Sequence, residues 1–214
     1  MFNFTEPLPE LLKTKYYECY AKIVLEELYQ EEFIDLKLED KPDLQMENGQ
    51  RGIEVVISED KKNLEAESLY SKIECNKIRN KEKAIEKIEK LGNIYKDGIL
   101  SSSSKVSFKF IFESFNDKID KLNGGGYDDF AWNYLFIFSS IIADNRMIKE
   151  AIREMKQIQS SKERKFYKVL VLVPGYLYCL DLYNDCYEIK PIDSKIQFNQ
   201  SGRARVLAES LIQH

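Results

Sequence analysis

Two periodicities of apolar residues run along this chain and predict helices and strands in alternation. Residues 8–30 place apolar side chains every three or four positions, which indicates an amphipathic helix. The same spacing, with lysine and glutamate at the remaining positions, covers 61–91 and predicts a long helix that ends at a Gly-Asn pair. Residues 144–159 form a clear helical pattern that Asp144 is suited to cap. We also expect helices over 105–122, where a strand is the alternative, and over 203–213.

Extended segments are predicted between these helices. A Lys-Pro pair at 41–42 favours extended backbone, and an Asn-Gly pair at 48–49 is a preferred two-residue hairpin turn, so a short strand is expected on each side of it. Continuous apolar runs at 132–142 and 166–173 predict buried strands. A Pro-Gly turn at 174–175 leads from the second run into a further strand.

The order of these elements predicts one α/β domain. Helices that alternate with buried strands favour a mixed sheet flanked by helices. The 214 residues can bury a sizeable core as a single unit, and we find no repeat or linker that divides them. The glycine-rich segment 123–129 is expected to be a flexible loop, because it lacks the lysine and hydroxyl residue of a phosphate-binding loop.

The chain has no apolar run of the roughly 18–20 residues that span a bilayer. Its N-terminus lacks the basic start and apolar centre of a signal peptide. We therefore expect a soluble, cytoplasmic protein that does not enter the membrane.

Composition excludes several kinds of catalytic site. The single histidine is His214, at the end of the sequence, which excludes histidine nucleophile systems, histidine general bases and histidine-ligated zinc. The four cysteines form no C-x-x-C pair and are expected to be reduced thiols. Catalysis must therefore use carboxylates, lysines or tyrosines.

Charge is distributed unevenly around a net value of −4. Residues 1–60 hold 15 acidic and 6 basic side chains and carry −9, so the remaining residues carry +5. An acidic cation-binding pocket in a body that meets phosphates would give this asymmetry, and so would solubility alone. Residues 144–168 hold 8 basic and 4 acidic side chains, which indicates either a phosphate-contacting face or an ordinary solvated helix.

The hairpin around the Asn-Gly turn brings two carboxylates together. If Asn48 and Gly49 are the loop residues, the register places Asp43 directly opposite Glu54. Opposed residues lie about 4.5–5.5 Å apart at Cβ, and like charges there are destabilising unless something neutralises them. A divalent cation does so with carboxylate and water ligands. The alternative is an ordinary acidic hairpin on the surface.

The segment KPDLQ…GIEVVIS, behind an acidic amphipathic helix, resembles the PD-(D/E)XK nuclease superfamily. The resemblance implies a restriction-endonuclease-like fold, an α/β mixed sheet flanked by helices, over a single domain of residues 1–214. The motif-bearing core covers about residues 10–90, the strand–helix–strand segment 130–183 is compatible with it, and residues 191–214 form a C-terminal tail.

The resemblance also implies the residues of a metal site. It makes Asp43 and Glu54 the catalytic acids that hold Mg²⁺ or Mn²⁺. Glu18, on the preceding helix, matches the accessory acid that some members contribute, and Glu26 is a weaker candidate for that role.

The motif lysine is missing from its expected position. It should stand two residues after the second acid, and that position holds Val56. In such enzymes the lysine helps to position the attacking water and offsets charge in the transition state. Some members take the lysine from the following helix, which makes Lys72 the candidate here, with Lys61, Lys62 and Lys77 in competition.

The resemblance thus implies metal-dependent hydrolysis of phosphodiester bonds in nucleic acid, with DNA favoured over RNA. Asp43 and Glu54 would be the ligands, Glu18 an accessory ligand and Lys72 the electrostatic partner. The alternative, which Val56 favours, is an inactive relative of the same fold that binds nucleic acid or protein. The oligomeric state stays open.

Overall fold

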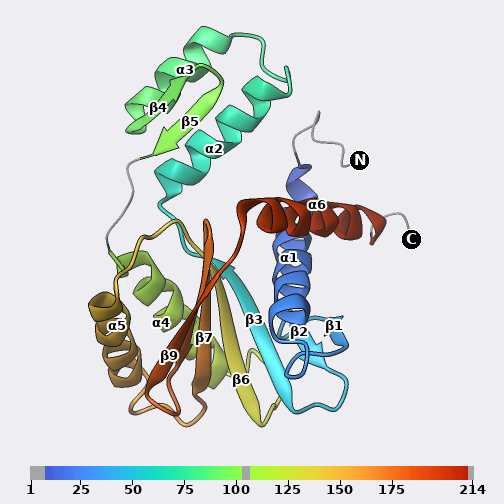
Figure 1. Cartoon of the computed structure of the whole chain (residues 1–214), viewed down its shortest axis with the longest axis vertical. Coiled ribbons are helices and arrows are strands. Elements are labelled where there is room, and N and C mark those ends of the chain that lie inside the picture. Colours follow the sequence, from blue (N-terminus) through green and yellow to red (C-terminus); the bar gives the residue numbers. More distant parts are fainter. Residues whose placement is uncertain (1–7, 103–106, 212–214) are drawn as a thin grey trace.

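The computed structural model describes residues 8–102 and 107–211, and a seven-stranded mixed sheet forms its centre (Figure 1). In spatial order the strands are β1 (Leu36–Leu38), β2 (Leu44–Met46), β3 (Arg51–Ile57), β6 (Trp132–Phe138), β7 (Phe166–Val173), β8 (Tyr176–Asp181) and β9 (Cys186–Pro191). Strands β3, β6 and β7 run parallel to one another, and the strands on both sides of them pair antiparallel.

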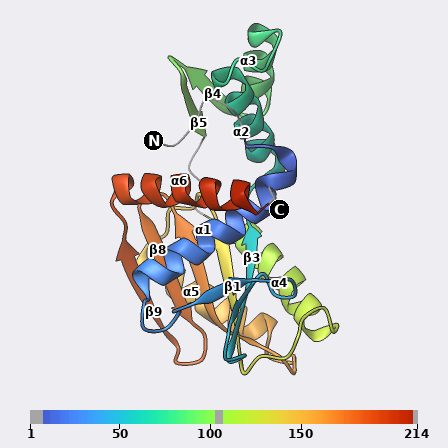
Figure 2. The same cartoon turned by 90° about the vertical axis from the view of Figure 1, so that its right-hand side faces the viewer.

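Helices cover both faces of this sheet (Figures 1 and 2). The short 3-10 helix η1 (Glu10–Leu12), α1 (Lys13–Leu28) and α6 (Ser194–Ser210) lie on one face, and α4 (Lys109–Asn123) and α5 (Asn145–Ile158) lie on the other. Each face buries its own apolar cluster, as alternation along a strand requires. On β3, Ile53 is buried in the α1 cluster, whereas Val56 packs against the α4 cluster.

A small lobe is inserted between β3 and α4. It consists of α2 (Lys61–Glu74), α3 (Lys81–Lys90) and the hairpin of β4 (Asn93–Lys96) and β5 (Ile99–Ser102). The lobe has a separate apolar cluster, which includes Ala66 and Ile88, and it projects beyond one end of the sheet (Figures 1 and 2).

The prediction of one long helix over 61–91 is wrong, because the chain turns between α2 and α3. Asn76 adopts a positive φ of 53°, and the side chain of Asn80 accepts the backbone N–H of Lys83 to cap the new helix. This turn folds α3 back so that Ile73 and Ile88 bury their apolar faces together.

The coarse fold prediction is confirmed: the sheet is mixed and helices flank it. The helix over 144–159 is confirmed with its cap, since Asp144 Oδ1 accepts the backbone N–H of Met147 at 2.8 Å. The helix predicted over 105–122 is α4; residues 105 and 106 lie outside the described residues. The helix predicted over 203–213 begins earlier, at Ser194, and its residues 212 and 213 lie outside the described residues.

Within residues 8–102 and 107–211, no helix combines the length and the apolar character that crossing a bilayer demands.

Candidate active site: a carboxylate pair and a lysine

The β2–β3 hairpin has the register that the Asn-Gly turn predicted. Leu44 lies opposite Ile53 and Gln45 opposite Gly52, so one further step places Asp43 opposite Glu54. Asp43 stands just before β2, and its Oδ2 accepts the backbone N–H of Val55 at 2.7 Å. The side chain of Asp43, instead of a backbone carbonyl of β2, therefore accepts the N–H of Val55 at the point where β2 begins.

Close packing fixes the turn that precedes Asp43. A Cβ atom on Gly52 would lie 2.7 Å from the ring of Phe130 and 2.8 Å from Cγ of Pro42, so only glycine leaves room for both. The backbone N–H of Asp128 also donates to the carbonyl oxygen of Lys41 at 3.0 Å. The loop after α4 is thus packed on this turn.

Arg164 holds the same loop from the other side, because its guanidinium donates to the carbonyl oxygens of Tyr127 and Asp128 at 3.1 and 2.5 Å. Residues 124–129 form a loop, as expected, in which Tyr127 is buried whereas Gly124, Gly125, Asp128 and Asp129 are exposed.

Glu54 is a buried carboxylate on the α4 face of the sheet. It is 4% exposed, and Lys118 Nζ lies 2.5 Å from its Oε1. Lys121, three residues later and therefore on the same face of α4, places Nζ 3.4 Å from the same oxygen. The two lysines thus place positive charge beside the buried carboxylate of Glu54.

The side chain of Tyr127 completes this cluster. Its hydroxyl is buried and forms no hydrogen bond of regular geometry with the described residues. Burial, and then the charge of Glu54, raise the pKa of this phenol, while Lys121 Nζ lies 4.6 Å from the centroid of its ring. Tyr127 is therefore a neutral hydroxyl directed at the carboxylate pair.

Asp43 carries the most perturbed carboxyl group of the site. Burial raises its pKa most and the charge of Glu54 raises it further, with a smaller contribution from Glu18. The hydrogen bond from Val55 and the charge of Lys118 act in the opposite direction, and the result is a pKa of about 7. Asp43 and Glu54 are thus a like-charge pair that resists double ionisation.

The structure places Glu18 near this pair. Glu18 lies on α1, is 3% exposed and accepts a hydrogen bond from Lys15 Nζ at 2.6 Å. Its charge contributes to the raised pKa of Asp43. Among the described residues, however, no three or more His, Cys, Asp or Glu side chains are close enough together to form a metal-binding group.

Glu26, the weaker candidate for the accessory acid, has a structural role. It forms an ion pair with Lys22 one turn earlier on α1 and accepts the backbone N–H of Leu36 at 3.2 Å. It thereby ties α1 to the start of β1.

Lys72 lies in the last turn of α2, exposed on the inserted lobe. The lysines that contact Glu54 are Lys118 and Lys121 of α4 instead. The competing Lys61 and Lys62 are also exposed, in the first turn of α2.

Sequence reasoning missed Lys118, although a weak signal exists. The apolar residues Phe115, Ile119 and Leu122 define the buried stripe of α4, and Lys118 lies beside this stripe rather than opposite it. A lysine at such a position can extend its aliphatic part along the core and place its ammonium group at the edge of the sheet.

The oxygen atoms of Asp43 and Glu54 are hard donors of the kind that Mg²⁺ and Mn²⁺ bind. Comparisons of the chain with protein-family models, with curated protein sequences and with solved structures find no match. A functional assignment therefore rests on the geometry of this site.

Proposed function

We propose that this protein is a metal-dependent nuclease of the PD-(D/E)XK type, with Lys118 in place of the motif lysine. The observation that carries the proposal is the Asp43–Glu54 pair: two opposed carboxylates, one with a pKa near 7 and the other 2.5 Å from a lysine. This is the set of groups that the motif brings together, although the lysine comes from a helix instead of the strand.

The order of elements supports a restriction-endonuclease-like core. The core of the superfamily is a helix, a hairpin-bearing sheet with the two acids, another helix and further strands. Helix α1, the β2–β3 hairpin with both acids, helix α4 and the parallel strand β6 follow in that order. The lobe of α2, α3, β4 and β5 is then an insertion between the second acid and the helix that carries the lysine.

The carboxylates fit a divalent cation. Ionised Asp43 repels Glu54, and a cation between them would remove that repulsion and lower the pKa of Asp43. Asp43 and Glu54 would hold it, with Glu18 close enough to act on it by charge. When bound, such a cation supplies Lewis acidity and neutralises charge on a phosphodiester.

The remaining groups act on the substrate directly. Lys118 places a positive charge beside Glu54, where it can donate to a phosphoryl oxygen and stabilise the charge that develops there. Tyr127 offers a neutral hydroxyl donor next to the same carboxylate. We propose DNA as the first substrate and RNA as the second.

A second candidate function has an observation of its own. Lys118 and Lys121 already neutralise Glu54 without any cation, and Val56 occupies the usual lysine position. An inactive relative that binds nucleic acid or protein would tolerate this arrangement.

The test is a cleavage assay with Mn²⁺ on single-stranded DNA, double-stranded DNA and RNA. We expect cleavage by the wild type and its loss in Asp43→Asn, Glu54→Gln and Lys118→Met. Lys72→Met is the matched control, since it removes an exposed lysine from the lobe, and it should retain activity.

A parallel measurement separates an inactive protein from a mislocated site. Mn²⁺ should raise the melting temperature of the wild type, because it binds the folded state, and should not raise that of Asp43→Asn. No cleavage together with no Mn²⁺ effect would favour the binding module. Cleavage that survives Asp43→Asn would show that the site is elsewhere.

A further inference from the structure

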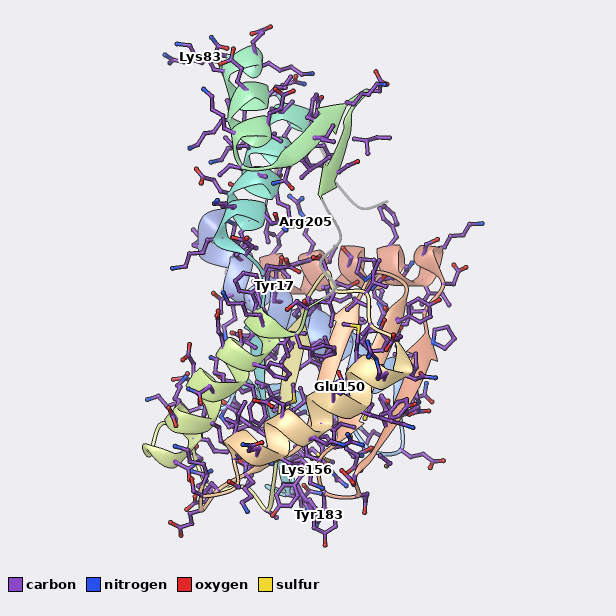
Figure 3. All side chains as sticks on the ribbon, turned by 90° about the vertical axis from the view of Figure 1, so that its left-hand side faces the viewer. Tyr17, Lys83, Glu150, Lys156, Tyr183 and Arg205 are labelled. Carbon is purple, nitrogen blue, oxygen red and sulfur yellow. The ribbon has the colours of Figure 1, made fainter. Side chains whose placement is uncertain are left out.

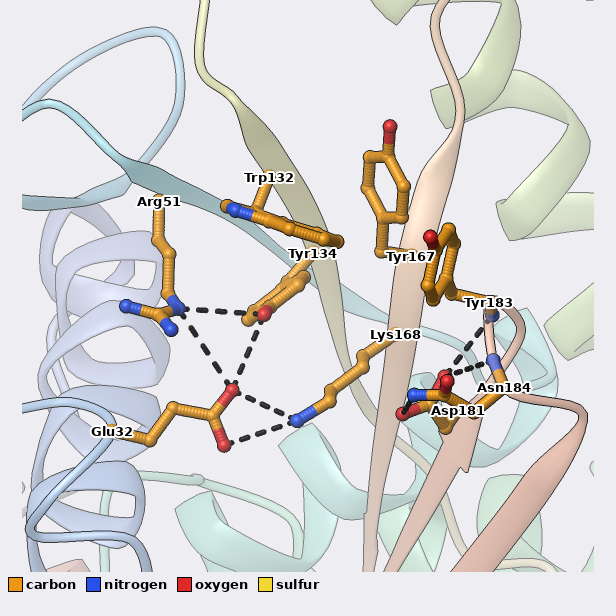
Figure 4. Close-up of a pocket in the computed structure, with 9 residues that line it drawn as sticks. All are labelled: Glu32, Arg51, Trp132, Tyr134, Tyr167, Lys168, Asp181, Tyr183 and Asn184. Atoms are coloured by element: carbon orange, nitrogen blue, oxygen red, sulfur yellow. Dashed lines mark hydrogen bonds and ion pairs between the residues drawn. The ribbon is translucent and has the colours of Figure 1, made fainter.

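A pocket of about 230 Å³ lies at the edge of the sheet where β3, β6 and β7 begin. Its aromatic residues include Trp132, the first residue of β6, and Tyr167, the second residue of β7 (Figure 4). Trp132 and Tyr167 pack against the cluster on the α1 face, whereas Glu54 contacts α4. The pocket is therefore separate from the carboxylate pair.

Alternation along β3 gives the same separation. Arg51 lines the pocket, and Glu54 follows it by three positions on the strand. An odd spacing directs the two side chains to opposite faces of the sheet. A ligand of the pocket can thus bind whether or not Asp43 and Glu54 hold a cation.

The aromatic rings form a continuous wall on one side of the pocket. The ring centroids of Trp132 and Tyr167 are 4.5 Å apart, and those of Trp132 and Tyr183 are 5.7 Å apart with the planes at 87°. Tyr183 is 65% exposed, and Figure 3 shows it at the end of the molecule remote from Lys83 of the lobe. Rings in mutual contact leave no cage for a cation, but they offer surface on which a planar ring can stack.

The other side of the pocket carries two basic side chains, Arg51 and Lys168, and two acidic ones, Glu32 and Asp181. Glu32 accepts two hydrogen bonds from Lys168 Nζ, at 2.8 and 3.0 Å, and lies 3.9 Å from Nε of Arg51. Two cations therefore surround one carboxylate. The second acid of the pocket, Asp181, accepts the backbone N–H groups of the turn after β8, at 3.1 and 2.8 Å.

Arg51 has hydrogen-bonding capacity for a ligand. Apart from Glu32, its guanidinium contacts the hydroxyl of Tyr134 and the sulfur of Met46, each at 3.4 Å. These are long contacts, and thioether sulfur is a weak acceptor. A guanidinium with five N–H donors beside an aromatic wall suits an anion joined to a flat ring.

We propose that this pocket binds an unpaired nucleotide of a single-stranded nucleic acid. The base stacks on the indole of Trp132, Tyr183 stands at 87° to that ring and contacts the edge of the base, and the phosphate contacts Arg51. Stacking on aromatic rings together with a cationic contact to the backbone is a general way to hold single strands. A neutral sugar would leave the guanidinium of Arg51 unused.

The chain provides its own probe, because Trp132 is its single tryptophan. Trp132 fluorescence is titrated in excess EDTA with oligothymidylate, oligouridylate, duplex DNA, thymidine and inorganic phosphate. Anisotropy of a labelled oligothymidylate serves as a second readout. We expect saturable quenching by both single strands, weaker quenching by thymidine, and none by duplex or phosphate.

Three variants locate the binding. Tyr183→Ala and Arg51→Gln should each weaken single-strand binding at least about five-fold, as loss of an aromatic contact or a phosphate contact does. Tyr176→Ala is the matched control: Tyr176 is 46% exposed at the other end of β8 and stacks on Tyr178, so binding should stay within about two-fold. Because Tyr183 is exposed, Tyr183→Ala keeps the test valid even if Arg51→Gln unfolds.

The proposal is overturned if no single strand quenches Trp132, or if labelled strands bind equally well after Tyr183→Ala. Equal quenching by inorganic phosphate would overturn it too, by showing a simple anion site. Saturable quenching by either oligothymidylate or oligouridylate would support the proposal. Asp43→Asn should leave the quenching of Trp132 by single strands unchanged even if it abolishes nuclease activity. The binding proposal and the nuclease proposal can therefore fail separately.

Discussion

Replacing Asp43 by asparagine should stabilise the folded protein at neutral and basic pH. The pKa of Asp43 is about 7 in the folded protein, against an ordinary value of 3.8. Between these pH values the folded state retains a proton that the unfolded chain has lost. The stability that this proton contributes is complete below pH 3.8 and is lost as the pH rises to 7.

The size of the effect follows from that difference. A shift from 3.8 to about 7 corresponds to about 4 kcal/mol of stability lost across this pH range. Asparagine has no charge to lose, and its side-chain oxygen can still accept the N–H of Val55. At pH 8 we expect Asp43→Asn to be more stable than the wild type by about 2–4 kcal/mol, or on the order of 4–16 °C in melting temperature.

The measurement is urea unfolding in EDTA at several pH values from 4 to 8, for the wild type and Asp43→Asn. The free energy of unfolding of the wild type should fall with pH more steeply than that of the variant. Asp144→Asn is the control, because asparagine also caps helices and Asp144 is exposed at the start of α5. Equal pH dependence in all three proteins, or a destabilised Asp43→Asn at pH 8, would refute the reasoning.

Three further predictions test the surroundings of this pair. Lys118→Met leaves buried Glu54 with Lys121 alone and should cost about 2–3 kcal/mol in urea unfolding, less than the ~3–5 kcal/mol of a fully broken buried pair. Gly52→Ala should destabilise by about 1–3 kcal/mol and reduce cleavage, because the new methyl group collides with side chains that position Asp43; normal stability would contradict this. Ile88→Ala should cost about 2–4 kcal/mol locally, seen as faster amide exchange in residues 61–102 with unchanged exchange in β6 and β7.

Local rules were sufficient to predict the carboxylate pair. A two-residue Asn-Gly loop predicts which residues face each other across the hairpin, so Asp43 and Glu54 follow from twelve residues of sequence. The structure has this register, although its turn is wider: residues 47–50 are unpaired and the N–H of Gly49 donates to the carbonyl oxygen of Met46. The Asp144 cap is predictable for the same reason, since donor and acceptor are three positions apart.

Lys118 could not be predicted in this way. It is 64 positions from Glu54, and its contact depends on how α4 packs against the sheet after the inserted lobe. In the sequence, Lys118 is one of many lysines on amphipathic helices. Lys72 is closer to Glu54 along the chain, but the lobe lies beyond one end of the sheet, so sequence proximity was a poor guide.

Other elements escaped prediction because pairing, rather than pattern, creates them. Strand β9 (Cys186–Pro191) has no buried residue, alternates between exposed and half-buried side chains, and forms by pairing with β8 at the edge of the sheet. Strands β1, β4 and β5 are only three or four residues long. The break at 75–80 contains neither proline nor glycine, so the helical periodicity on both sides concealed it.

The two candidate functions differ in what they require of Asp43. Glu54 does not distinguish the nuclease from the binding module, because Lys118 and Lys121 balance its charge whether or not a cation binds. Asp43 forms no ion pair within the described residues, the charge of Lys118 only partly offsets its burial, and its ionised form is therefore costly. Asparagine would make the same hydrogen bond to Val55 without that cost, so a pure binding module gains nothing from a carboxylate at this position. A carboxylate is favoured only when a ligand offsets its charge, and a divalent cation is the ligand that two opposed carboxylates hold best, which is why we place the nuclease before the binding module.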